Sequence, residues 1–120
     1  MITASLKNYR QSPRKVRLVA NMVRGKSVKQ ALDTLEFVAK KATDPISVLI
    51  KSAVANAKNN FNIESDNLFL KEIRVDAGYI LKRRMPRARG MAFPINKRTS
   101  HVSIVLDSKA PKADKPSKKK

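Results

Sequence analysis

One segment of the sequence combines many cationic side chains with no carboxylate. Its positive residues are Lys82, Arg83, Arg84, Arg87, Arg89, Lys97 and Arg98. Seven cations without an anion are suited to binding phosphate, because each neutralised phosphate releases counterions and gives affinity that does not depend on sequence. Arginine predominates, and guanidinium groups can bridge two phosphates or stack on bases, which favours folded RNA as the ligand. A solvated, disordered basic loop is the alternative interpretation.

A second group of cations lies on a predicted helix. Ser12-Pro13 is a typical helix start, the apolar residues from Val16 to Val23 follow at helical spacing, and Gly25 indicates the end, so we predict a helix from Pro13 to about Arg24. On this helix and near its ends lie Arg10, Arg14, Lys15, Arg17, Arg24 and Lys26. A solvated helix face usually mixes both signs of charge, whereas this helix carries no acid. We therefore predict that it also contacts RNA.

Catalytic and metal-binding residues are scarce. His101 is the only histidine and there is no cysteine, which excludes a histidine cluster, disulfides and thiolate zinc sites. Ser100 is adjacent to His101, and neighbouring residues of a strand point to opposite faces, so the two form no catalytic dyad. Glu72 and Asp76 share a face of a predicted strand, where we expect them to pair with nearby cations. We predict that the chain is not an enzyme and needs no cofactor.

The remaining helices and strands must hold these cations in place. Ser27 and Gln30 form a capping box for a second helix that ends near Lys41, and Asp44-Pro45 starts a third whose apolar residues run from Ile46 to Ala57. Alternation or β-rich composition predicts strands at residues 2–6, 68–75 and 102–106.

The breakers Pro86, Gly90 and Pro94 place a turn between the last two strands. If Val75 pairs near Ile104, the turn falls around Arg89-Gly90, and each arm of roughly 14 residues spans about 45 Å. A folded body of this size has a radius of gyration of about 13 Å, so the arm must project beyond it. We predict an α+β fold in which three helices pack on a small antiparallel sheet with a long protruding β-hairpin at about 79–101. This single domain covers residues 1–108, and the lysine-rich segment 109–120 is predicted to be a disordered basic tail.

Overall composition agrees with a polyanionic partner. The 120 residues include 27 Lys and Arg against 9 Asp and Glu, a net charge of +18, which repels itself unless an anion neutralises it. We find no apolar run long enough for a spanning helix and no signal-peptide core near the N-terminus, so we expect a cytoplasmic location and no membrane partner. A DNA-bending architectural protein with a basic β-arm is the main alternative. The first two helices also mimic a helix-turn-helix, although the second carries acids on its exposed face.

Several motifs resemble one known family. They are Ser12-Pro13-Arg14-Lys15-Val16-Arg17-Leu18-Val19-Ala20, Arg24-Gly25-Lys26, Ser52-Ala53-Val54-Ala55-Asn56-Ala57, Met85-Pro86-Arg87-Ala88-Arg89-Gly90 and Lys97-Arg98-Thr99-Ser100-His101-Val102. In this order they closely resemble the bacterial form of large-subunit ribosomal protein twenty-two, over roughly residues 2–107. The resemblance implies a structural protein of the large subunit whose long hairpin reaches through ribosomal RNA to the wall of the nascent-peptide exit tunnel.

The resemblance also implies roles for particular residues. Thr99, Ser100 and His101 would brace the returning arm against RNA. The tip would line the tunnel, close to where macrolide antibiotics bind in this family, with Pro86, Arg87, Ala88, Arg89, Gly90, Met91, Ala92 and Phe93. The implied partners are ribosomal RNA, neighbouring large-subunit proteins and the nascent peptide, without a homo-oligomer.

Overall fold

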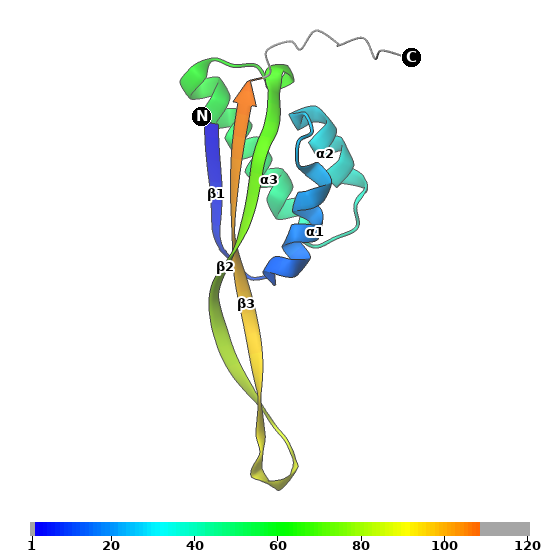
Figure 1. Cartoon of the computed structure of the whole chain (residues 1–120), viewed down its shortest axis with the longest axis vertical. Coiled ribbons are helices and arrows are strands. Elements are labelled where there is room, and N and C mark those ends of the chain that lie inside the picture. Colours follow the sequence, from blue (N-terminus) through cyan, green and yellow to red (C-terminus); the bar gives the residue numbers. More distant parts are fainter. Residues whose placement is uncertain (1, 109–120) are drawn as a thin grey trace, which may run out of the picture.

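Three helices lie on one face of a three-stranded sheet, and two of the strands continue far beyond it (Figure 1). The computed structural model describes residues 2–108, so the predicted basic tail at 109–120 lies outside the described residues. In chain order the elements are β1 (Ile2–Tyr9), α1 (Pro13–Val23), α2 (Val28–Phe37), α3 (Thr43–Phe61), the 3-10 turn η1 (Ser65–Asn67), β2 (Leu68–Pro86), the 3-10 turn η2 (Ala88–Gly90) and β3 (Ala92–Ser108). The predicted α+β class with three helices on an antiparallel sheet is confirmed.

The sheet is antiparallel, with strand order β1-β3-β2. Val75 pairs with Val102, two residues from the predicted partner Ile104, which instead pairs with Ile73. Between the turn and Val75 the β2–β3 pairing is irregular at residues 77–80, which changes the register by one residue; a second irregularity of one residue, between Leu70 and Glu72, lies farther from the turn. The turn nevertheless falls at Ala88–Gly90, where it was predicted.

One core holds the helices to the sheet. Val102, Ile104 and Leu106 are buried on β3, while the alternate residues of that strand are more exposed. Buried positions on the helices, such as Val19 and Ile50, pack against this face. Among the described residues, no apolar side chain between positions 76 and 101 is buried. The core therefore stops where β2 and β3 leave the third strand.

Beyond that point β2 and β3 form a two-stranded ribbon. β1 ends at Tyr9, opposite Ser100, whereas β2 and β3 remain paired out to Pro86 and Ala92. The radius of gyration is 18.8 Å and the extents are 69 × 43 × 22 Å. A globular chain of this length has a radius of gyration of about 14 Å, so the predicted protruding hairpin is present.

The ends of several elements differ from the sequence expectations. α2 ends at Phe37 rather than near Lys41. α3 begins at Thr43, whose Oγ1 donates to the Lys40 carbonyl at 2.6 Å, so the predicted Asp44 cap is wrong and Asp44 lies within the first turn. Ser12 makes no capping hydrogen bond, and of the predicted capping box only the Gln30 N–H donating to Ser27 Oγ, at 3.4 Å, is observed. Turn hydrogen bonds and burial decide these boundaries more than side-chain capping signals do.

Candidate nucleic-acid interface

The hairpin, defined as residues 80–98, is a ribbon with two unlike faces. Residues opposite each other across the ladder share a face, so the pairs Met85–Phe93, Arg83–Ile95 and Leu81–Lys97 lie on one side. The other face carries Ile80, Lys82, Arg84, Pro86, Ala92, Pro94, Asn96 and Arg98. All but one of the larger aliphatic and aromatic side chains in the paired strands thus share the first face, and cations occur on both. The sequence analysis identified these residue types but not their division between faces.

The tip is a tight, exposed turn. Arg89 and Gly90 both have positive φ, 63° and 68°, which glycine adopts readily and arginine does not. The Arg87 N–H donates to the Met91 carbonyl at 2.8 Å and closes the loop. All eight predicted tip residues, 86–93, are exposed, including Met91 and Phe93. The turn therefore presents arginine and apolar side chains together.

Cations from distant parts of the sequence meet where the hairpin joins α1. A concave site of about 680 Å³ is lined by Arg10, Gln11, Ser12, Lys15, Lys41, Asn96, Lys97 and Arg98. Four of its five cations were predicted as RNA contacts, and the fold brings them together. Lys41 was missed, because it lies in the α2–α3 loop and only the tertiary fold places it here. We call this site the basic concavity.

Arg17, Arg24 and Lys26 occupy a different place. Both the Nε and Nη2 of Arg17 donate to the Val75 carbonyl, at 3.3 and 3.0 Å, and Nη2 of Arg24 donates to the Ile73 carbonyl at 3.0 Å. Lys26 Nζ donates to Thr34 Oγ1 at 3.3 Å. The two arginines cover the outer edge of β2, and backbone bonds from Gly25 and to Lys26 continue this protection along Leu70. Part of the predicted RNA-binding helix therefore stabilises the sheet.

The segment 99–101 is turned inward at the neck, which we define as residues 8–11, 77–79 and 99–101. Thr99 Oγ1 donates to the Tyr79 carbonyl at 2.6 Å, and Ser100 Oγ donates to the Gln11 carbonyl at 3.1 Å. Both side chains are buried. His101 Nδ1 accepts the Asn8 N–H at 3.1 Å. In this structure the buried side chains of Thr99 and Ser100 offer no surface to RNA, which corrects the predicted contact; the Thr99 hydroxyl joins β3 to β2, and the Ser100 hydroxyl joins β3 to the segment before α1.

Few of the described cations have an acidic partner. Among residues 2–108 the ion pairs are Lys71–Asp107 at 3.4 Å and Arg74–Glu72 at 2.6 Å. The hydrogen bond and negative charge of Glu72 raise the pKa of Arg74. Pairing of Glu72 with a cation, as predicted, is confirmed, whereas Asp76, for which the same was predicted, forms no ion pair among residues 2–108. No hairpin cation takes part in either ion pair, so the positive charge of the hairpin is not neutralised within the described residues.

Comparison with known proteins identifies the family. The model described as ribosomal protein L22p/L17e matches residues 4–107, nearly the whole described chain. The chain belongs to this family.

Relatives from several organisms support the L22p/L17e assignment. A protein of Herpetosiphon aurantiacus named large ribosomal subunit protein uL22 is 51% identical over 104 residues, which cover 87% of this chain and 92% of the relative. A protein of the same name from Lactobacillus helveticus is 49% identical over 106 residues, which cover 88% of this chain and 91% of the relative. Another, from Deinococcus radiodurans, is 50% identical over 109 residues, which cover 91% of this chain and 81% of the relative. The resemblance seen in the motifs is thus confirmed over most of the chain.

Membership of the L22p/L17e family decides between the functional classes left open by composition. The family is structural and non-enzymatic, which agrees with the prediction made from the sparse catalytic residues. The DNA-bending and helix-turn-helix alternatives receive no support from it. No described helix is both long and apolar enough to cross a membrane.

Proposed function

We propose that this chain is a structural constituent of the large ribosomal subunit that binds ribosomal RNA through its hairpin, the basic concavity and the outward-facing cations of α1. Its L22p/L17e family and its relatives, each named large ribosomal subunit protein uL22, support the ribosomal assignment. Ribosomes work in the cytoplasm, so the chain is expected there, beside ribosomal RNA and neighbouring ribosomal proteins.

The hairpin is the observation that carries the RNA-binding part of the proposal. It extends from the body without a buried apolar residue of its own, and an isolated two-stranded ribbon is marginal in water. Its seven cations lack acidic partners among the described residues. Phosphates on both sides of the ribbon would neutralise these charges and supply the contacts that it lacks. Such contacts fix position rather than read base sequence.

The basic concavity supplies a second anchor. Arg10 and Lys15 approach it from the start of α1, Lys97 and Arg98 from β3, and Lys41 from the α2–α3 loop. Gathering five like charges costs electrostatic energy in the free protein, and a phosphate bound among them relieves that cost. A bound backbone phosphate would also fix the angle between hairpin and body.

The tip has a more specific proposed role. By analogy with the family, residues 86–93 lie at the wall of the nascent-peptide exit tunnel and face the growing chain. The exposed Arg87, Arg89, Met91 and Phe93 give this turn both charge and apolar surface. A nascent peptide would therefore meet a mixed surface.

The test compares RNA binding by two variants that each lose four positive charges, one in the hairpin and one on the helical side of the body. One variant carries Arg83→Ala, Arg84→Ala, Arg87→Ala and Arg89→Ala; the matched control carries Lys29→Ala, Lys40→Ala, Lys51→Ala and Lys58→Ala, all on or beside α2 and α3. Binding to large-subunit ribosomal RNA is measured at several salt concentrations. We expect the hairpin variant to lower the slope of log affinity against log salt by about 3, and the control by less than about 1. Unchanged affinity and slope in the hairpin variant would refute the proposal.

A further inference from the structure

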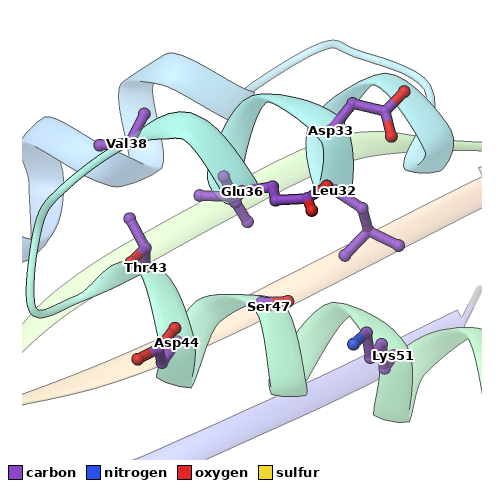
Figure 2. Close-up of a pocket in the computed structure, with 9 residues that line it drawn as sticks. Leu32, Asp33, Glu36, Val38, Thr43, Asp44, Ser47 and Lys51 are labelled. Atoms are coloured by element: carbon purple, nitrogen blue, oxygen red, sulfur yellow. The ribbon is translucent and has the colours of Figure 1, made fainter.

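A second surface lies between α2 and α3 and has a different character (Figure 2). One concavity, of about 460 Å³, is lined by Leu32, Asp33, Leu35, Glu36, Val38, Thr43, Asp44, Ser47 and Lys51. Another, of about 340 Å³, is lined by Val28, Lys29, Leu32, Lys51, Val54, Ser65 and Asp66. Because both are lined by Leu32 and Lys51, the two concavities adjoin each other, and we call them together the α2–α3 groove.

Helical spacing builds the two walls of the groove. On α2, Lys29 and Asp33 stand four residues apart, as do Leu32 and Glu36. On α3, Asp44, Ser47, Lys51 and Val54 follow one another at intervals of three or four. Figure 2 shows Leu32 pointing from α2 toward α3, with Ser47 and Lys51 on the facing helix. The side chains of two helices therefore border the same channel.

The charge of the groove is opposite to that of the hairpin and the basic concavity, because its lining carries four carboxylates against the two lysines Lys29 and Lys51. Asp33, Glu36 and Asp44 surround one end and Asp66 lies at the other, so four of the nine acidic residues of the chain gather here. None of these four forms an ion pair among residues 2–108. Carboxylates without partners repel RNA phosphate and attract cationic side chains. On this chain of net charge +18, the groove is thus suited to a polypeptide partner.

Apolar side chains supply a floor for such a partner. Val28 is buried, and Leu32 and Val54 are partly buried against the core. On the same two helices, Phe37 and Val48 are 86% and 65% exposed. An apolar floor with a charged rim is typical of surfaces that bind peptide segments. From Asp44 to Val54 the helix rises about 15 Å, the length of about five extended residues.

We propose that the α2–α3 groove binds a short, extended, lysine- or arginine-rich segment of another protein. Its basic side chains pair with Asp33, Glu36 and Asp44, and its apolar side chains rest on Leu32 and Val54. This contact is separate from RNA binding by the hairpin. It gives the molecule one surface for nucleic acid and another for a protein neighbour.

A peptide probe tests the proposal on the full chain. The probe is fluorescein-labelled Lys-Leu-Lys-Leu-Lys, whose extended form puts lysines on one side and leucines on the other; the uncharged Gln-Leu-Gln-Leu-Gln is the control peptide. Anisotropy should show binding of the basic peptide and not of the uncharged one. Equal binding of both, or no binding of the basic peptide, overturns the proposal.

Two triple variants of equal charge separate groove binding from general attraction. The first carries Asp33→Asn, Glu36→Gln and Asp44→Asn; the second carries Glu64→Gln, Asp76→Asn and Asp107→Asn, all outside the groove. We expect the first to weaken binding of the basic peptide about tenfold, since each exposed pair contributes modestly, and the second less than about twofold. Equal losses in both variants mean attraction without a site and refute the proposal. Circular dichroism checks that both variants fold.

A crosslinking measurement tests the groove in chains that have been assembled into large ribosomal subunits. A photo-reactive residue at Ser47, in chains incorporated into large subunits, should crosslink to a protein segment rich in lysine or arginine, and the groove triple variant should lose that product. Crosslinks from Ser47 to RNA would overturn the proposal. The same group at Arg84 reports on the hairpin, so its failure to reach RNA counts against the proposed function and not against the groove.

Discussion

The body and the hairpin are made from the same two strands in different surroundings. Backbone pairing joins β2 and β3 along both their inner and their outer parts, and both register shifts fall in the inner part, yet only the inner parts alternate buried and exposed residues (Figure 1). All the buried apolar residues belong to the body, and the hairpin has none. Strand pairing therefore gives the hairpin its shape, whereas burial of apolar surface gives the body its stability.

The neck is the junction between the body and the hairpin. On one side Thr99 and Ser100 are buried and bonded to backbone carbonyls; on the other, every residue from 80 to 98 is at least partly exposed. Gly78 leaves the room that this junction needs, because a Cβ there would lie 2.4 Å from Thr99 Oγ1. The close approach of the Thr99 and His101 side chains, and not positive φ, explains the glycine at this position.

Hydrogen exchange should show the largest contrast between the regions. In the free protein we expect amides of residues 102–106 to exchange at least about 100-fold more slowly than hairpin amides, because core strands open only with global unfolding. Binding of large-subunit ribosomal RNA should then slow exchange in residues 80–98. Mass spectrometry of deuterium uptake measures both effects. Equal protection in the free protein would mean that the hairpin has a stabilising core of its own.

Core truncation should separate the regions by several kcal/mol. Ile50 is fully buried, so Ile50→Ala should lower the free energy of unfolding by about 2–5 kcal/mol through lost burial and a cavity. Ile95→Ala, the matched change in the hairpin, should lower it by less than about 0.5 kcal/mol. Urea denaturation followed by circular dichroism compares them. Similar losses would show that the two regions share one cooperative core.

The neck can be tested by adding one methyl group. Gly78→Ala should destabilise the protein by about 1–3 kcal/mol, because its Cβ overlaps the Thr99 hydroxyl. The same substitution in a Thr99→Ala background should cost less, since the overlapping atom is gone. A double-mutant cycle by thermal or urea unfolding measures the coupling. An identical cost in both backgrounds would rule out the proposed close packing.

The smallest effect is expected at the edge of β2. Arg17→Ala removes the two donors to the Val75 carbonyl and should cost about 1 kcal/mol of stability. Arg14→Ala, on the same helix, removes an exposed arginine for which the structure shows no hydrogen bond or ion pair among residues 2–108, and should change stability by less than about 0.5 kcal/mol. Equal stability of the two variants would indicate that Arg17 only faces solvent.

Local patterns in the sequence predicted most of the elements. Helical spacing located α1 and α3 because one apolar face must meet the core, and the breakers around Gly90 located the turn because few residues fit it. The pairing of β1 with β3 and the two register shifts between β2 and β3 were not predictable in this way. They depend on contacts between residues far apart in the chain.

The candidate site divides in the same manner. The charge of the hairpin was evident from residue type alone, and all of its predicted cations are exposed. Arg17, Arg24, Thr99 and Ser100 could not be distinguished from RNA contacts by type, because the carbonyl groups that they bind come from other elements. Lys41 gave no local signal at all.

The sequence by itself determined that a cation-rich ribbon must project from a small helical and β-stranded body, because charge and apolar periodicity are local properties. Only the tertiary structure decided which cations stay free for phosphate and which fasten the sheet. It also gathered acidic residues of two helices into one groove, because distances between side chains on different elements are set by packing and not by position along the chain.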